Sequence, residues 1–397
     1  MPVLKPFRAL QAKEALMHTV ATSSSDFNSE AELRDELRQN PNNYFHMSKN
    51  HLINEDSVPG TSDFFRNAKV AFDYFVDSEV VAPVSGDIYY VYRQTANDVS
   101  HTGIIGLCDI VDYQRDKIKR HEHTRPATED FLATYIDTTK VIGEPVLLSH
   151  HHKQSLEDLL RWIIQTEPTV DYHKKGKRHQ IWKIEDPELI RSFEDEVASL
   201  DEFYIMDGHH RAASVSKLYE QHQTNDYRYC MSYLLDSNQL TISPFHRLVE
   251  VNSISFESLM ESLRTDFVIE EIPEYAIRPE HKGEFVLRCN EGSFRLIHKQ
   301  SSSMLDVQLL EEKVLKAIFN VADSRSDDRI TFIATDDELN DAIVTSSAPG
   351  TYLFLLHPCT FEEVAHISDN NQFMPPKSTF VEPKCESGMF IQPYGGV

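Results

Sequence analysis

The sequence predicts a mixed α/β (α+β) protein with more than one domain. Segments with strand-like alternation or short apolar runs interleave with segments of helical periodicity along most of the chain. Its 397 residues exceed the length of one average domain. Hydrophobic residues make up 40% of the chain and aromatic residues 10%, which is enough for ordinary globular cores. We therefore expect two or three domains.

Residues 1–85 predict an N-terminal extension that is mostly helical. Ser29–Pro41 predicts a helix in which Ser29 and Glu32 form a capping box. Thr61–Val80 predicts a second helix with an apolar face. That face comprises Phe64, Phe65, Ala68, Phe72 and Phe75. Because these positions recur at helical spacing, we expect them to belong to the core.

Residues 86–250 alternate between strand and helix and predict a core domain. The expected strands are Asp87–Gln94, Gly103–Tyr113, Glu144–His150, Ile181–Asp186, Glu202–Asp207 and Tyr227–Asp236. The expected helices are Ser155–Gln165, Pro187–Leu200 and one that begins near Arg211. Ser155 is the expected N-cap of the first of these helices.

Residues 251–397 predict a C-terminal α+β domain. Strand-like and helical segments alternate again from Ser255 to His357. The stretch that begins at Met374 is rich in proline and glycine and is expected to be mostly loop.

Charge and cysteine content narrow the class of protein. The chain has 63 acidic residues against 39 lysines and arginines, a formal net charge of -24, which disfavours binding to nucleic acid or anionic membranes. The basic run His173–His179 is expected to be a solvated loop. The five cysteines form no CxxC pair and predict free thiols in a reducing compartment.

No targeting or membrane-spanning segment is expected. The first residues lack the apolar core of a signal peptide, and no apolar run approaches the ~20 residues that cross a bilayer. These features predict a soluble, cytoplasmic protein. They leave its oligomeric state open.

The stretch Asp207-Gly208-His209-His210-Arg211 falls where a strand passes into a helix. Glycine allows a tight turn, and the free N–H groups at a helix start favour phosphate. Arg211 can contact phosphate oxygens in a bidentate manner, and the histidines supply further donors. Asp207 can hold Mg²⁺. The stretch therefore predicts a phosphate-binding turn with a metal-binding carboxylate.

Two other interpretations of this stretch stay open. The histidines can merely cap the helix or fill space. They can also join His121 or His123 in a transition-metal site, although the chain has no HExxH or CxxC frame.

Glu122 lies between histidines in Ile118–Pro126, just before an expected helix. A carboxylate in such a position suits a general base. In phosphoryl transfer it would orient an acceptor hydroxyl and accept its proton. The alternative is a surface charge cluster.

Lys377, Ser378 and Thr379 follow two prolines near the end of the chain. A lysine beside two hydroxyls can bind a carboxylate or a phosphate. The alternative is an ordinary polar loop. The chain has no GxxxxGK[ST] P-loop and no GxGxxG after a strand, so a bound nucleotide would be held by a less common fold.

Three motifs together resemble the domain of unknown function 1015 family. They are Met206–Arg211 ("MDGHHR"), Arg120–Thr124 ("RHEHT") and Met374–Lys384 ("MPPKSTFVEPK"), supported by Pro6–Leu10 and Tyr90–Gln94. That family is similar to the free serine kinases of ParB/sulfiredoxin-like fold. The resemblance implies a ParB/sulfiredoxin-like nucleotide-binding core and covers essentially the whole chain.

The resemblance implies a role for each motif. Glu122 matches the catalytic base of these kinases. Asp207, a second catalytic residue, would hold Mg²⁺, and Gly208, His209, His210 and Arg211 would bind the phosphates of ATP or ADP. Lys377, Ser378 and Thr379 would bind the amino acid. His209 stands where sulfiredoxin places its reactive cysteine, which argues against sulfinic-acid reduction.

Three functions follow as hypotheses. The first is a kinase that transfers phosphate from a nucleotide to free L-serine or a similar small hydroxylated acceptor. The second is a nucleotide-binding ParB-like switch or assembly module without transfer activity. The third is a silent scaffold that binds no nucleotide. The first is favoured because the motifs supply both a base and a phosphate-binding turn. The N-terminal extension and the long insertion before Glu202 can alter the acceptor.

Overall fold

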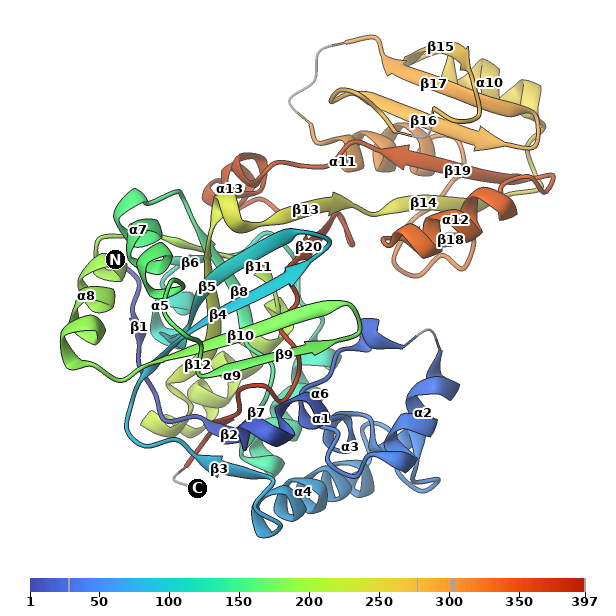
Figure 1. Ribbon diagram of the computed structural model, residues 1–397. Coiled ribbons are helices and arrows are strands. Elements are labelled where there is room, and N and C mark those ends of the chain that lie inside the picture. Colours follow the sequence, from blue (N-terminus) through green and yellow to red (C-terminus); the bar gives the residue numbers. More distant parts are fainter. Residues whose placement is uncertain (28, 277, 301–303, 396–397) are drawn as a thin grey trace. The chain divides into compact units, whose positions relative to one another are not determined.

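The computed structural model describes residues 1–27, 29–276, 278–300 and 304–395 (Figure 1). The chain forms two compact units. Unit 1 consists of Met1–Leu240 and Pro383–Val397, and unit 2 consists of Thr241–Glu382. The predicted mixed α/β fold class is confirmed. The division into residues 1–85, 86–250 and 251–397 stays a prediction.

Unit 1 is built on a nine-stranded sheet. Its strands are β1 (Leu4–Lys5), β4 (Tyr89–Ala96), β5 (Val99–Asp109), β6 (Ile118–Lys119), β8 (Val146–His150), β9 (Val170–Lys174), β10 (Lys177–Ile184), β11 (Phe203–Asp207) and β12 (Tyr229–Asp236). The strand order is β6-β11-β8-β12-β5-β4-β10-β9, with β1 paired to β5. β6 runs parallel to β11, and β8 parallel to β12. The central strands are buried on both faces, as their near-continuous Val, Ile, Leu and Tyr content requires.

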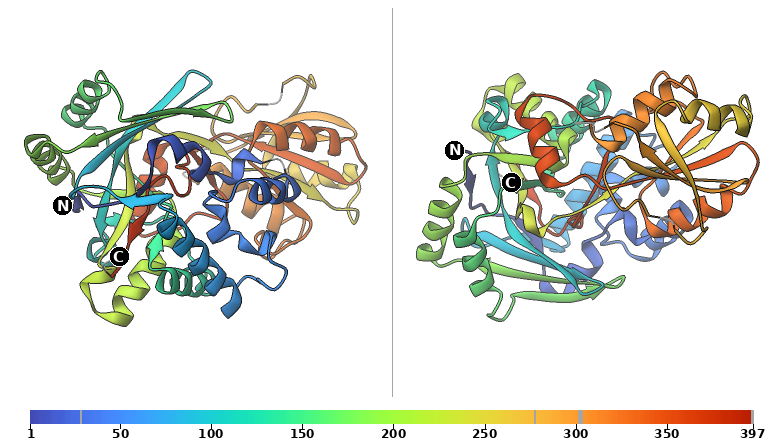
Figure 2. Two further views of the ribbon diagram at one scale, coloured as in Figure 1. Left: turned by 60° about the horizontal axis from the view of Figure 1, so that its bottom comes forward. Right: turned by 90° about the horizontal axis from the view of Figure 1, so that it is seen from above.

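The helices of unit 1 pack on one another, and some of them also contact the sheet. They are α1 (Met17–Val20), α2 (Glu30–Gln39), α3 (Phe45–Ser48), α4 (Ser62–Asp77), α5 (Ile110–Gln114), α6 (Pro126–Thr139), α7 (Gln154–Ile163), α8 (Pro187–Ala198) and α9 (His209–His222). α9 packs against β8 and β12 and against α5 and α6, while α7 packs against α8 (Figure 2).

The two N-terminal helices form where the sequence predicts them. The Ser29 side chain accepts a hydrogen bond from the Glu32 amide at the start of α2. The buried residues of α4 are Phe64, Phe65, Ala68, Phe72 and Phe75, the five that were expected. The apolar face of α4 and the position of Ser29 as N-cap are confirmed, because local capping and periodicity decide them. The reciprocal hydrogen bond of the Glu32 side chain, which would complete a capping box, stays a prediction.

Three local predictions are wrong. α7 has Lys153 as its N-cap, so Ser155 lies inside the first turn. α9 begins at His209 rather than near Arg211. The basic run His173–His179 is not a loop, since it forms the ends of β9 and β10 around a two-residue turn. Lys175 and Gly176 both have positive φ there, which suits a tight hairpin.

The C-terminal segment returns to unit 1 and is part of its core. Met389, Phe390, Ile391 and Tyr394 are all buried. β21 (Gln392–Pro393) pairs with β7 (Val141–Ile142), and the β2 (Leu10–Ala12) strand exchanges backbone hydrogen bonds with Ile391. β2 also pairs with β3 (Val81–Pro83). The two ends of the chain thus stabilise the same unit.

Unit 2 contains a six-stranded sheet of its own. Its strands are β14 (His246–Glu250), β15 (Phe267–Ile272), β16 (Glu284–Cys289), β17 (Gly292–His298), β18 (Ile330–Ile333) and β19 (Thr351–Leu356), in the order β15-β17-β16-β19-β14-β18. Its helices are α10 (Phe256–Leu263), α11 (Asp306–Leu310), α12 (Asp336–Thr345) and α13 (Phe361–Asp369). β13 (Thr241–Pro244) and β20 (Thr379–Glu382) pair separately at its two ends.

Within the described residues, no helix is both long and apolar enough to cross a membrane. All five cysteines lie in the described part of the chain and are free thiols. That agrees with the expectation from their scattered positions in the sequence.

Candidate functional site

The turn between β11 and α9 has the geometry expected for an anion site. Gly208 is the N-cap residue of α9 with φ of 92°, and no side chain caps the first turn. A Cβ atom at this position would lie 2.7 Å from the Arg211 guanidinium. Glycine is therefore required both by the backbone angle and by the close approach of Arg211. The start of a helix whose first turn has no side-chain cap favours an anion.

Sheet topology brings the segment containing Glu122 to this turn. β6 lies beside β11 in parallel, with Ile118 opposite Phe203. The chain leaves both strands at the same edge of the sheet, so the residues after Lys119 meet those after Asp207. Two of the three predicted motifs are thus adjacent in unit 1, although more than eighty residues separate them in sequence.

His121, Glu122 and His209 are in contact at this edge. The His121 and His209 rings stack edge to face with centroids 4.5 Å apart, and both side chains are buried. Burial lowers the pKa of His121 to about 4 and that of His209 well below its usual value. Both imidazoles are therefore neutral at pH 7.

The tautomer of His209 follows from its neighbours. The His121 backbone N–H lies 3.5 Å from His209 Nε2 and donates to it, so Nδ1 carries the proton. His209 Nδ1 lies 3.8 Å from Glu122 Oε2. The Glu122 side chain is 39% exposed, so its carboxylate lies near the His209 ring without a hydrogen bond to it and is accessible to solvent. An accessible carboxylate is compatible with a general base.

Asp207 and Arg211 belong to a chain of alternating charges. Arg211 Nη2 lies 2.7 Å from Asp207 Oδ2, and Nη1 lies 2.7 Å from Glu144 Oε2. Lys384 Nζ lies 2.7 Å from Asp207 Oδ1. Ser387 donates to Glu144 Oε1 at 2.7 Å. The network fixes the Arg211 guanidinium between two carboxylates.

The pKa of Asp207 reflects this network. Partial burial acts to raise it, but the charges of Arg211 and Lys384 outweigh burial and lower the pKa to about 2. Asp207 is therefore ionised at every pH at which the protein would be assayed, which is the state that a Mg²⁺ ligand needs.

The donor set fits a magnesium ion only together with a phosphate ligand. No group of three or more His, Cys, Asp or Glu side chains that could hold a metal occurs within the described residues. Mg²⁺ is commonly held by one or two carboxylates plus substrate phosphates and water. Asp207 can serve in that way, because each of its oxygens retains a lone pair beside its cation partner.

Lys377, Ser378 and Thr379 lie in unit 2, where other residues of that unit hold them. The Ser378 hydroxyl donates to the Pro375 carbonyl at 2.6 Å, and Arg247 donates to the Lys377 carbonyl at 3.0 Å. Lys377 Nζ lies 5.2 Å from the Phe332 ring centroid. Thr379 begins β20. Their expected role in substrate binding stays a prediction.

Three residues of the network were not expected from the sequence: Glu144, Lys384 and Ser387. In the sequence, Glu144 stands only at the start of an expected strand. Lys384 lies in a second Pro-Lys pair, Pro383-Lys384, seven residues after the one that was singled out. The repeated Pro-Lys pair was the available signal.

Glu386 lies between Lys384 and Ser387 but is buried in a different environment. Tyr172 donates to Glu386 Oε2 at 3.1 Å, and His179 Nε2 lies 3.3 Å from Oε1. The Glu386 side chain is 1% exposed, and burial raises its pKa to about 7. The carboxyl group is thus held largely in its neutral form below neutral pH.

A raised folded-state pKa predicts a loss of stability with rising pH. The stabilisation from Glu386 is fully present below pH 4.5, its unfolded-state pKa, and is lost as pH rises through about 7. We expect the free energy of unfolding of the wild type to fall by about 2–3 kcal/mol relative to Glu386→Gln between pH 5 and 8. Urea denaturation at several pH values measures this difference. Glu185→Gln, at an exposed glutamate, should show the same change in unfolding free energy with pH as the wild type. If the free energy of unfolding of Glu386→Gln also changes with pH as that of the wild type does, the pKa of Glu386 is ordinary.

Comparison with known proteins places the chain in a family. The family described as Protein of unknown function (DUF1015) matches residues 4–318, and the chain belongs to it. No curated protein matches.

Similar solved structures include SbnI with C-terminal truncation from Staphylococcus aureus, at 13% identity and a TM-score of 0.42, covering 71% of this chain and 85% of that one. They also include a free serine kinase variant in complex with ADP, at 16% identity and a TM-score of 0.37, covering 69% of this chain and 90% of that one. A conserved hypothetical protein from Pyrococcus furiosus has 15% identity and a TM-score of 0.34, covering 68% of this chain and 90% of that one. The family membership and the similarity to free serine kinases were both expected from the sequence.

Proposed function

We propose that this protein is a phosphotransferase that passes phosphate from ATP or ADP to the hydroxyl of free L-serine or a similar small acceptor. The observation that carries the proposal is the position of Glu122 beside His209, at the uncapped start of α9. A solvent-accessible carboxylate and a phosphate-binding turn are the two parts that such a transfer needs.

Glu122 acts as the base. It accepts a hydrogen bond from the acceptor hydroxyl and takes its proton as the acceptor oxygen bonds to phosphorus. The bond between phosphorus and the bridging oxygen of the nucleotide breaks, and the nucleotide leaves with one phosphate fewer. The neutral His209 ring lies beside the Glu122 carboxylate, with Nδ1 3.8 Å from Oε2.

Gly208, His209, His210 and Arg211 hold the phosphates. The amides of the first turn of α9 supply neutral donors, and Arg211 supplies a fixed positive charge. Asp207 would hold Mg²⁺ with water and phosphate oxygens, and the ion would supply charge neutralisation on the phosphates. Lys384 offsets the charge of Asp207 from the other side.

Lys377, Ser378 and Thr379 are proposed to bind the carboxylate of the amino-acid acceptor. Support for this role comes from residue type: an ammonium group and two hydroxyls suit a carboxylate. The Thr379 side chain is the freer of the two hydroxyls, because Ser378 already donates to Pro375.

A phosphoryl-transfer assay tests the function. The full chain is incubated with Mg²⁺ and either ATP or ADP, and L-serine is offered first, followed by other hydroxylated amino acids and small alcohols. Mass spectrometry identifies the product. O-phosphoserine is expected, and another phosphorylated small molecule would keep the reaction while changing the acceptor. Nucleotide binding without any transfer would favour the second candidate, a nucleotide-dependent switch or assembly module, and would overturn the proposal.

A further inference from the structure

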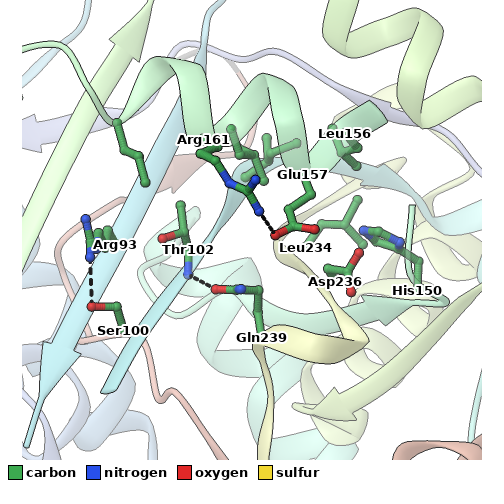
Figure 3. Close-up of a pocket in the computed structure, with 13 residues that line it drawn as sticks. Arg93, Ser100, Thr102, His150, Leu156, Glu157, Arg161, Leu234, Asp236 and Gln239 are labelled. Carbon is green, nitrogen blue, oxygen red and sulfur yellow. Dashed lines mark hydrogen bonds and ion pairs between the residues drawn. The ribbon is translucent and has the colours of Figure 1, made fainter. Parts of the chain in front are cut away.

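A second pocket in unit 1 shares no residue with the candidate site. It has a volume of about 180 Å³ and lies between α7 and one face of the nine-stranded sheet (Figure 3). Its floor follows from strand register: Arg93 pairs with Thr102, Ile104 with Leu234, and His150 with Asp236. Cross-strand partners share a face of the sheet, so these six side chains line the same side.

Side chains on the opposite face of β4 contact the C-terminal segment that carries Lys384. Gln94, the neighbour of Arg93, donates to the Lys384 carbonyl, and the Tyr92 hydroxyl bonds to His179. Because successive side chains of a strand point to opposite faces, Arg93 points away from that cluster. The pocket is therefore a separate site.

One wall of the pocket is apolar. This wall is formed by Leu156 and Leu160 of α7 and by Ile164, which follows the end of that helix. Ile104 and Leu234 of the sheet line the pocket as well. An engineered apolar cavity of roughly 150 Å³ accommodates benzene. A pocket of about 180 Å³ therefore suits a ligand with a compact apolar body of similar size.

The carboxylates that line the pocket already have partners within the protein. Asp236 accepts from His152 Nδ1 at 2.9 Å, from the Lys153 amide at 3.0 Å and from the Asn238 amide at 2.9 Å. Glu157 is paired with Arg161, as Figure 3 shows. Both carboxylates therefore have their hydrogen-bonding needs met by groups of the protein.

Arg93 differs from these carboxylates. Its Nη2 donates to the Ser100 hydroxyl at 2.9 Å, a neutral partner, and its buried Nε makes no hydrogen bond with the described residues. Among the described residues no carboxylate forms an ion pair with Arg93, whereas Arg178 on the neighbouring strand β10 pairs with Asp171. A half-buried guanidinium without a counter-charge is costly, and an anionic ligand would remove the cost.

Neutral donors stand beside Arg93. The Gln239 Oε1 accepts from the Thr102 amide at 3.0 Å, which fixes the Gln239 side chain at the pocket with its NH₂ group as a donor. The Thr102 hydroxyl lines the same wall. One positive charge with two neutral polar groups, next to an apolar wall, describes a binding site for a single carboxylate.

We propose that this pocket binds a small monocarboxylate with a compact apolar body. The carboxylate bonds to Arg93, with Gln239 and Thr102 beside it, and the apolar part packs against Leu156, Leu160, Ile104 and Leu234. A ligand with a second charge is disfavoured, because Asp236 and Glu157 have their partners within the protein.

Calorimetric titration of the full chain with 4-methylpentanoate and with benzoate tests the proposal. Each acid is compared with its primary amide, which has the same shape and no charge. We expect at least one acid to bind, and its amide to bind about 10- to 100-fold more weakly, the range for a hydrogen bond to a charged group. Arg93→Gln should weaken acid binding by a similar factor. Arg178→Gln, at an arginine on the neighbouring strand β10 outside the pocket, should not change it.

Leu160→Gln is the second variant and changes the apolar wall. It should weaken the binding of both acids while leaving Arg93 in place. Circular dichroism melts confirm that each variant is folded. The proposal is overturned if neither acid binds the wild type, if the amides bind as tightly as the acids, or if Arg93→Gln binds both acids unchanged.

Discussion

Glu122→Gln should reduce phosphoryl transfer by about 10²- to 10⁴-fold, the usual contribution of a general base. Glutamine keeps the size of the side chain and its contact with the His209 ring, so the site should remain assembled. What it loses is the ability to take a proton. Nucleotide affinity should be unchanged, because the phosphates bind to the start of α9 and to Arg211. Turnover measured at saturating nucleotide and acceptor, together with calorimetry for the nucleotide, separates the two effects.

Glu185→Gln provides the control, since it removes one exposed glutamate of unit 1 far along the chain from the site. It should have wild-type turnover and affinity. Full turnover of Glu122→Gln would show that another group, or water, takes the proton. A parallel loss of nucleotide affinity in this variant would instead assign Glu122 to binding.

Asp207→Asn should weaken nucleotide binding in the presence of Mg²⁺ by at least about tenfold. Changes to the outer-shell partners of metal ligands cost about 10- to 100-fold in metal affinity or activity, so loss of a direct ligand should cost at least the lower value. Without Mg²⁺, binding should be unchanged or tighter, because the substitution removes a negative charge beside the phosphates. Titrations with ADP in Mg²⁺ and in excess chelator measure the two cases.

The Asp171→Asn variant is a matched control, because Asp171 also pairs with an arginine in unit 1, Arg178. Its nucleotide affinity should equal that of the wild type under both conditions. If Mg²⁺ raises the ADP affinity of Asp207→Asn as much as it raises that of the wild type, Asp207 is not a metal ligand. Its role is then to orient Arg211 and Lys384.

Local features of the fold could be predicted because short-range rules decide them. The α4 face and the Ser29 cap depend on residues within one or two helical turns. The passage from β11 into α9 was visible because Gly208 breaks an apolar run and alanines follow it. Boundaries were less accurate, as the starts of α7 and α9 show, since several residues compete to begin each helix.

The assembled site could be predicted only in part. The residue types around Gly208 indicated phosphate chemistry, but the contact between Glu122 and His209 depends on β6 lying beside β11. Nothing in either segment encodes that pairing. Lys384 and Ser387 were missed for a related reason: they reach Asp207 and Glu144 only because the chain returns to unit 1 after completing unit 2.

That return has a consequence for how the protein is made. A ribosome that has synthesised the residues up to Leu240 has produced most of unit 1, yet Lys384, Ser387 and the buried Phe390 and Ile391 do not exist. The nascent chain must wait, with part of its core uncovered, until all of unit 2 has emerged. The network around Asp207 is therefore completed last, so a prematurely terminated chain would have the turn at Gly208 without Lys384, the lysine that pairs with Asp207.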